Sequence, residues 1–113
     1  MSNEVKEYFE KFQKSAEKMK ELTPDAVAAF SGLFAKTIKD GALSVKEKEL
    51  IALGMGLVLR CEPCIRMHTK KCLDAGATKE QVLDVASVAL MMGGGPVYTH
   101  IPLLIETVEA LTA

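Results

Sequence analysis

The sequence predicts an all-α protein with roughly six helices. Three observations lead to this fold class. Apolar residues recur at three- and four-residue steps, capping residues, prolines and glycines mark where helices start and stop, and no segment alternates apolar and polar side chains as a strand would. We expect residues 1–113 to form one domain, with an N-terminal amphipathic helix in residues 1–22 and a core in residues 43–112 that carries the cysteine motif described below.

The first two helices are predicted for residues 5–22 and 24–39. In the first, the apolar positions are separated mostly by Lys, Glu and Gln. These apolar positions are Val5, Tyr8, Phe9, Phe12, Ala16, Met19 and Leu22. In the second, Thr23 is a capping residue, Pro24 suits the first helical position, and Gly41 closes the segment.

A third helix is predicted to start after Ser44, because Ser44 and Glu47 have the spacing of a capping box. It continues to Leu59 with few polar residues, which is typical of a central helix that is covered on most sides. A fourth helix is expected from Cys61 to Ala75, and Gly76 after it is a good left-handed terminator.

Two more helices complete the chain. Thr78 and Gln81 form a second capping box, which predicts a helix over residues 79–92. Gly93-Gly94-Gly95-Pro96 should break that helix, since glycine is conformationally free and proline cannot continue a hydrogen-bonded turn. The last helix is expected over residues 97–111.

Composition excludes several classes of function. The chain is 49% apolar and 26% charged, as in a globular protein and unlike a disordered one. The net charge is −1 with no block of like charge, so nucleic acid and anionic membrane surfaces are not expected partners. The absence of a signal-like start and of a long apolar run predicts a cytoplasmic protein. The apolar content fits either self-association or an ordinary well-filled core.

The segment Cys61-Glu62-Pro63-Cys64-Ile65-Arg66-Met67-His68 is the part of the chain that indicates chemistry. Two cysteines three positions apart at a helix start can form a disulfide, and the positive end of the helix favours thiolate over thiol. His68 lies four residues after Cys64, so on a helix the imidazole can exchange a proton with the sulfur. These residues predict a reversible dithiol; the helix start favours Cys61 as the attacking sulfur, whereas the pairing with His68 favours Cys64.

Other interpretations of the cysteines remain open at this point. In one alternative, the pair is half of a zinc site that His68 or Cys72 would complete. In another, the two cysteines are inert buried thiols. Cys72 by itself is interpreted as a small packing residue. Arg66 and the Lys70-Lys71 pair are interpreted as a solvated helix face.

Glu49 is the second residue of interest, because the helix after it is largely apolar. On a helix, Glu49, Leu53, Gly56 and Arg60 share one face, and Gly56 leaves room for another element to come close. Glu49 either points inward and orients an imidazole, or is a solvated carboxylate favoured by the helix dipole.

The spacing of these residues resembles a known family signature. Glu49, eleven residues, Cys61, two residues, Cys64, three residues and His68 is similar to the pattern of the AhpD-like proteins of the carboxymuconolactone decarboxylase superfamily. The resemblance runs from about residue 43 to residue 90. It implies an all-helical fold and a homo-oligomer, trimer or hexamer, with the redox helix near subunit contacts.

The resemblance also implies a function. It implies a peroxidase or disulfide oxidoreductase with a redox-active disulfide, in which Glu49 and His68 relay protons, Cys64 is the activated thiol and Cys61 closes the disulfide. The implied substrate is a hydroperoxide or a disulfide, the implied reductant is a lipoamide-like dithiol or a small redox protein, and no metal, flavin or haem cofactor is needed. Pro63 stands where other members have a histidine, which favours dithiol exchange over strong peroxidase activity.

Two other functions are compatible with the same residues. The superfamily takes its name from lactone decarboxylases, but those enzymes work without a cysteine pair. A non-enzymatic zinc-binding or assembly module would use the cysteines as ligands or packing residues.

Overall fold

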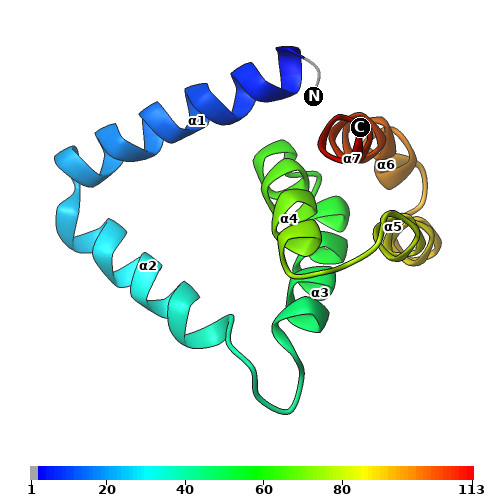
Figure 1. Cartoon of the computed structure of the whole chain (residues 1–113), viewed down its shortest axis with the longest axis horizontal. Coiled ribbons are helices and arrows are strands. Elements are labelled where there is room, and N and C mark those ends of the chain that lie inside the picture. Colours follow the sequence, from blue (N-terminus) through cyan, green and yellow to red (C-terminus); the bar gives the residue numbers. More distant parts are fainter. Residues whose placement is uncertain (1–2) are drawn as a thin grey trace.

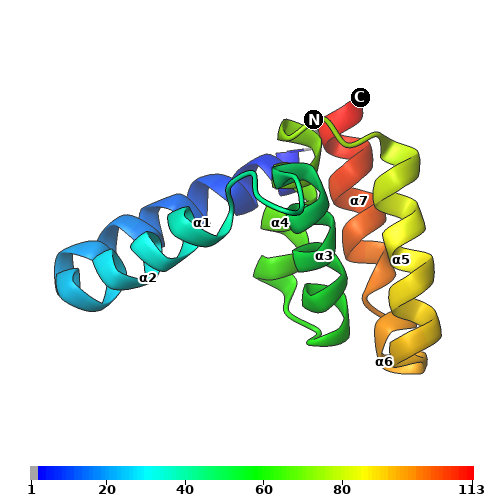
Figure 2. The same ribbon diagram turned by 90° about the horizontal axis from the view of Figure 1, so that it is seen from below.

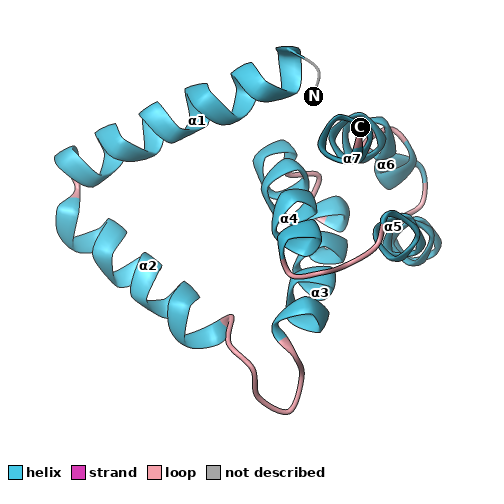
Figure 3. Ribbon diagram, viewed as in Figure 1, coloured by secondary structure: helices cyan, strands magenta, loops and turns pink. Residues whose placement is uncertain are grey.

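The structure is a computed structural model that describes residues 3–113, and within this range it consists of helices and the loops that join them (Figures 1 and 3). The helices are α1 (Asn3–Leu22), α2 (Pro24–Thr37), α3 (Val45–Val58), α4 (Glu62–Asp74), α5 (Lys79–Gly93), α6 (Gly95–Tyr98) and α7 (Ile101–Thr112). The predicted all-α fold class is therefore confirmed. No helix in the described range has the length and apolar character needed to cross a bilayer.

The helices form a packed body and a projecting arm. We call α3–α7 the body and α1–α2 the arm, which extends away from the body in Figure 2. The start of α1 lies against α7, where Val5 is fully buried, whereas α2 has no buried residue. Met19 and Leu22, at the far end of the amphipathic face predicted for α1, are exposed. That face is thus covered by this chain only at its beginning.

The core lies between α3, α4, α5 and α7. Helix α3 packs against α4 and α5, and α4 also packs against α7. Burying a Leu, Ile or Val side chain stabilises the fold by about 1.5–3 kcal/mol. The fully buried apolar side chains of the body include Leu53, Leu57, Ile65, Val82, Leu104 and Val108.

The predicted helix starts are confirmed at α3 and α5. Ser44 Oγ accepts from the Glu47 backbone N–H at 3.1 Å, and the Glu47 side chain accepts from the Ser44 N–H at 2.8 Å. Thr78 and Gln81 form the same box. Thr23 is at the predicted N-cap position of α2, but its hydroxyl donates back to the Met19 carbonyl at 2.8 Å and makes no capping hydrogen bond.

The single last helix predicted from residue 97 is wrong, because the structure has the four-residue α6 followed by α7. The glycine break is where it was expected, and Gly94 adopts a positive φ of 67°. Pro102, near the start of α7, has no N–H to donate to the Tyr98 carbonyl, so a continuous helix would lose a hydrogen bond there. The chain instead turns at Thr99 and His100.

Helix α3 is also less covered than its apolar sequence predicts. One face packs into the core, but Ile51, Met55 and Val58 on the other face are 45%, 61% and 44% exposed. These side chains and the facing side of α5 line an apolar groove of about 780 Å³. Helix α3 thus has two apolar faces. One is buried in the core, and the other stays exposed to solvent in the single chain.

Candidate functional site

The cysteine motif lies at the tight junction between α3 and α4. Arg60 adopts a positive φ of 56°, a conformation uncommon for residues other than glycine, and it turns the chain back after α3. The Cys61 N–H then donates to the Gly56 carbonyl at 3.1 Å. This turn brings the first residues of α4 directly against the last turns of α3.

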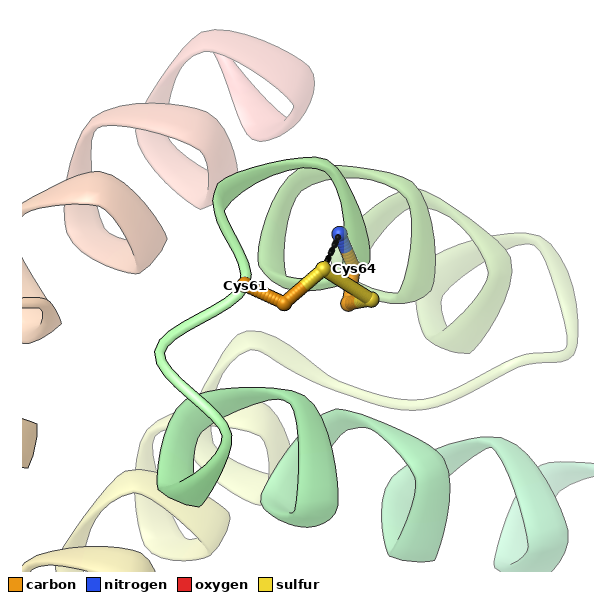
Figure 4. The surroundings of a disulfide bond; sticks show 2 residues. All are labelled: Cys61 and Cys64. Carbon is orange, nitrogen blue, oxygen red and sulfur yellow. Dashed lines mark hydrogen bonds between the residues drawn. A yellow bond between two sulfur atoms is a disulfide. The ribbon is translucent and has the colours of Figure 1, made fainter.

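Cys61 and Cys64 form a disulfide, with their Cα atoms 5.2 Å apart (Figure 4). Cys61 is also the N-cap of α4, and its Sγ accepts a hydrogen bond from the Cys64 backbone N–H at 3.2 Å. Pro63 lies in the first turn, where its missing N–H costs no helical hydrogen bond. The sulfurs therefore sit at the positive end of a 13-residue helix, an environment that favours thiolate in the reduced form.

Gly56 provides the room that this arrangement needs. A Cβ at position 56 would lie 3.0 Å from the Cβ of Cys64 and 3.5 Å from its backbone carbon. The close approach expected at Gly56 is thus present, and the element that comes close is the start of α4.

Glu49 and His68 contact each other across α3 and α4. Glu49 Oε1 lies 2.7 Å from His68 Nδ1, and the two side chains are only 4% and 15% exposed. Glu49 is on α3 and His68 is on α4, one helical turn after Cys64. Of the two interpretations of Glu49, the structure has the inward-pointing carboxylate.

Phe34 is part of the same surroundings, although nothing in the sequence distinguishes it from other apolar residues of α2. Its ring is stacked on the His68 ring, with the centroids 6.0 Å apart and the planes 13° from parallel. The Lys71 Nζ lies 3.9 Å from the centre of the Phe34 ring. Only the fold brings this helix of the arm to α4, so sequence spacing could not find the contact.

Arg66 was wrongly interpreted as part of a solvated face, because its side chain is 8% exposed. Its Nε donates to Glu62 Oε2 at 3.0 Å, and its Nη1 donates to Thr107 Oγ1 at 3.0 Å and lies 3.6 Å from Glu106 Oε1. The guanidinium also lies over the Tyr8 ring, 4.9 Å from its centre. Arg66 thus joins the start of α4 to both α7 and α1.

Tyr8 is affected by this cluster. Partial burial and the nearby Glu62 carboxylate raise the pKa of the Tyr8 hydroxyl, and the Arg66 charge opposes that effect. The phenol therefore stays protonated at neutral pH.

The third cysteine lies in the core. Cys72 is fully buried and free, and burial, together with the charge of Glu49, raises the pKa of its thiol to about 12. A thiol that does not ionise near neutral pH fits the interpretation of Cys72 as a packing residue. Within residues 3–113, no group of three or more His, Cys, Asp and Glu side chains is arranged to share a metal ion.

Comparison with known proteins identifies one matching family and several relatives of similar sequence. Residues 24–103 match the carboxymuconolactone decarboxylase family. An uncharacterized protein of Cupriavidus necator is 34% identical over 90 residues, which are 80% of each chain. An uncharacterized protein of the cox locus of Paracoccus denitrificans is 39% identical over 72 residues, which are 64% of this chain and 65% of that protein.

Two solved structures share the fold. A carboxymuconolactone decarboxylase family protein from Legionella pneumophila superposes with a TM-score of 0.92 at 29% identity, over 99% of this chain and 100% of its own. One from Thermotoga maritima, for which a role in the antioxidative response has been suggested, gives a TM-score of 0.72 at 34% identity, over 77% of this chain and 90% of its own.

Proposed function

Because the chain belongs to the carboxymuconolactone decarboxylase family and carries a disulfide-forming cysteine pair, we propose that it is an AhpD-like thiol-disulfide oxidoreductase that also reduces hydroperoxides. The observation that carries this proposal is one cluster: the Cys61–Cys64 disulfide at the start of α4, with the Glu49–His68 pair one turn further along. A lactone decarboxylase needs no such pair of sulfurs.

Glu49 and His68 are suited to move a proton to and from the cysteines. Because Nδ1 of His68 is bonded to Glu49, Nε2 is the ring nitrogen left to exchange protons with a thiol or a substrate. The buried carboxylate fixes the tautomer of the ring and stays beside it as a counter-charge while the ring carries the extra proton.

In the peroxide reaction, the proposed first step is attack of the Cys64 thiolate on the terminal oxygen of the hydroperoxide. The S–O bond forms as the O–O bond breaks, and the alcohol leaves with a proton supplied through His68. The Cys61 thiolate then attacks the sulfenic sulfur of Cys64, water leaves, and the disulfide forms. The structure described above has this oxidised form of the pair.

An external dithiol closes the cycle. Two thiol–disulfide exchanges transfer its two electrons to the Cys61–Cys64 disulfide, so the protein dithiol is regenerated and the reductant becomes a disulfide. By family analogy this reductant is lipoamide-like or a small redox protein. Such a cycle fits the cytoplasm, where dithiol reductants keep thiols reduced.

The test follows free thiols and hydroperoxide together in the reduced wild type, in His68→Ala and in His100→Ala. His100, the other histidine, bonds to the Pro96 carbonyl and serves as the matched control. We expect His68→Ala to slow peroxide consumption by about 10²-fold or more and His100→Ala to leave it unchanged. If peroxide disappears slowly in the wild type and His68→Ala makes no difference, the peroxidase activity is wrong and only disulfide exchange remains.

We also propose that the chain works as a homo-oligomer, a trimer or a hexamer. The groove between α3 and α5 and the arm both expose large apolar side chains, and monomeric proteins rarely expose large contiguous apolar patches. The residues concerned in the arm are Met19, Leu22, Phe30 and Leu33. A second copy of the chain would cover both surfaces.

Sedimentation equilibrium tests the assembly. We expect a mass of three or six times the 12.2 kDa of one chain. Met55→Glu, which places a charge in the groove, should lower that mass, whereas Leu43→Glu, outside the groove, should not. A wild-type protein that sediments as a monomer would contradict the proposal.

A further inference from the structure

Phe34 contacts the catalytic histidine from a helix that lies outside the body. We propose that Phe34 is a positioning residue, which fixes the plane of the His68 ring and so fixes the direction in which Nε2 exchanges its proton. This inference rests on the proposed function, because it assigns Phe34 a role in the His68 proton transfer.

Glu49 alone cannot hold the ring in one orientation. Its hydrogen bond joins one carboxylate oxygen to one ring nitrogen at 2.7 Å, and a single such bond leaves the plane of the imidazole free to tilt about it. A parallel aromatic ring restricts that tilt, and Phe34 lies only 13° from parallel to His68. The hydrogen bond and the stacking together restrict the directions in which Nε2 can point.

Phe34 is itself held in place from two sides. Lys71 is three residues after His68 on α4, and its Nζ lies 3.9 Å from the centre of the Phe34 ring, a cation–π contact. Helix α2 is anchored at its end by Lys48 of α3, whose Nζ donates to the Thr37 carbonyl at 3.0 Å and to the Lys39 carbonyl at 2.7 Å. Although α2 buries no residue, these contacts join the end of α2 to α3 and the Phe34 ring to α4.

The expected effect concerns the rate of the chemical step. Misplacing a proton-transfer group by about 1 Å can cost about 10²-fold in rate. Phe34→Leu keeps an apolar side chain but removes the ring, so it should slow the His68-dependent reaction by about 5- to 100-fold. Phe34→Tyr keeps the ring and should restore the wild-type rate.

The experiment measures the rate at which the reduced protein reacts with an aromatic disulfide, dithiobis(nitrobenzoate), between pH 6 and 9 by stopped flow. It compares the wild type, His68→Ala, Phe34→Leu and Phe34→Tyr with a matched control, Phe30→Leu. This control changes a ring one turn earlier on α2 and keeps an apolar side chain on the surface proposed to meet a second copy of the chain. The proton NMR shifts of the His68 ring report the nearby Phe34 ring, because the ring current of an aromatic neighbour changes them.

The inference is supported if His68→Ala and Phe34→Leu both slow the reaction and change its pH profile, and Phe34→Leu shifts the resonances of the His68 ring. Phe34→Tyr and Phe30→Leu should behave as the wild type. It is overturned on its own if His68→Ala is slow but Phe34→Leu reacts normally, or if Phe30→Leu is as slow as Phe34→Leu. If His68→Ala itself reacts normally, the proton relay in the proposed function is wrong and the role of Phe34 is excluded with it.

Discussion

Gly56 of α3 and Cys64 of α4 lie so close together that a methyl group at position 56 would be 3.0 Å from the Cβ of Cys64. The next atoms it would meet belong to the backbone of α4, which cannot move aside as a flexible side chain can. The close packing of α4, which carries the cysteine pair, on α3 therefore depends on a residue without a side chain.

Gly56→Ala should lower the free energy of unfolding, and Gly54→Ala in the same helix is the control. Replacing a helical Gly by Ala gains up to about 1 kcal/mol, but overpacking costs about 1–3 kcal/mol. At Gly54 the added Cβ meets only Val85 Cγ1, at an ordinary 3.4 Å. Urea denaturation should show Gly56→Ala to be less stable than Gly54→Ala by about 2 kcal/mol. Equal stability would show that α4 can shift without cost.

Glu49→Gln should reduce the rate of thiol oxidation while leaving the fold intact. The amide fills the same buried space but provides no negative charge beside the His68 ring. Removing such an orienting carboxylate typically costs about 10- to 100-fold. Stopped-flow oxidation of the reduced protein measures the loss, and Glu80→Gln, an exposed residue in the first turn of α5, should react as the wild type. An unchanged rate in Glu49→Gln would remove the carboxylate from the relay.

Arg66→Lys should destabilise the protein by about 1–3 kcal/mol, since a lysine cannot reproduce the planar fork that reaches Glu62 and Thr107 together. Thermal or chemical unfolding measures this loss. Lys70→Met removes an exposed ion pair with Asp74 and should change the stability by only about 0.5 kcal/mol. If the two variants lose the same free energy of unfolding, the Arg66 cluster contributes no more to stability than a surface ion pair does.

Because of the raised pKa of Cys72, we expect the oxidised protein to lose stability at alkaline pH. In the folded chain the pKa of the Cys72 thiol is raised to about 12, whereas its ordinary value is 9.0. The unfolded chain therefore ionises first, and stability present below pH 9.0 is lost as the pH rises toward 12. The slope approaches about 1.4 kcal/mol per pH unit for one proton.

Urea denaturation at pH 8 to 10 of the wild type and of Cys72→Ala checks this prediction. The disulfide form is used because Cys61 and Cys64 do not titrate in it. The slope attributed to Cys72 should be absent in Cys72→Ala, even though that variant is less stable at every pH because it leaves a small cavity. The same slope in both proteins would assign the alkaline loss to other groups.

Most of the helices could be predicted because their ends are encoded by local chemistry. Ser44 and Thr78 bond to backbone and side chain groups three residues away, so their effect does not depend on the rest of the fold. Thr23 shows the limit of such reasoning. Its hydroxyl could bond either to a backbone N–H at the start of α2 or to a carbonyl at the end of α1, and it bonds to the Met19 carbonyl of α1. The division of the last helix depends on Pro102, which has no N–H to continue the preceding turn and which the apolar periodicity alone does not reveal.

The sequence predicts only those residues of the candidate site that share one helix or that belong to the family's spacing pattern. Cys61, Cys64 and His68 follow from positions along a single helix. Glu49 is distinguished by the largely apolar helix that follows it and by the family spacing, and the fold places it beside His68. Phe34 and the partners of Arg66 come from helices distant in sequence, and neither residue type nor periodicity distinguishes them from ordinary apolar or surface positions. These contacts require the three-dimensional arrangement.

The cap made by Cys61 affects how mutants of the pair have to be compared. Since its sulfur is the acceptor that caps the start of α4, an alanine at position 61 removes both the proposed reactive atom and a helix-stabilising one, the latter at a cost of about 1 kcal/mol. Serine offers an oxygen for the same N–H and deletes the reactivity alone. Comparing the two replacements therefore separates the proposed chemical role of the Cys61 sulfur from its structural role at the start of the helix.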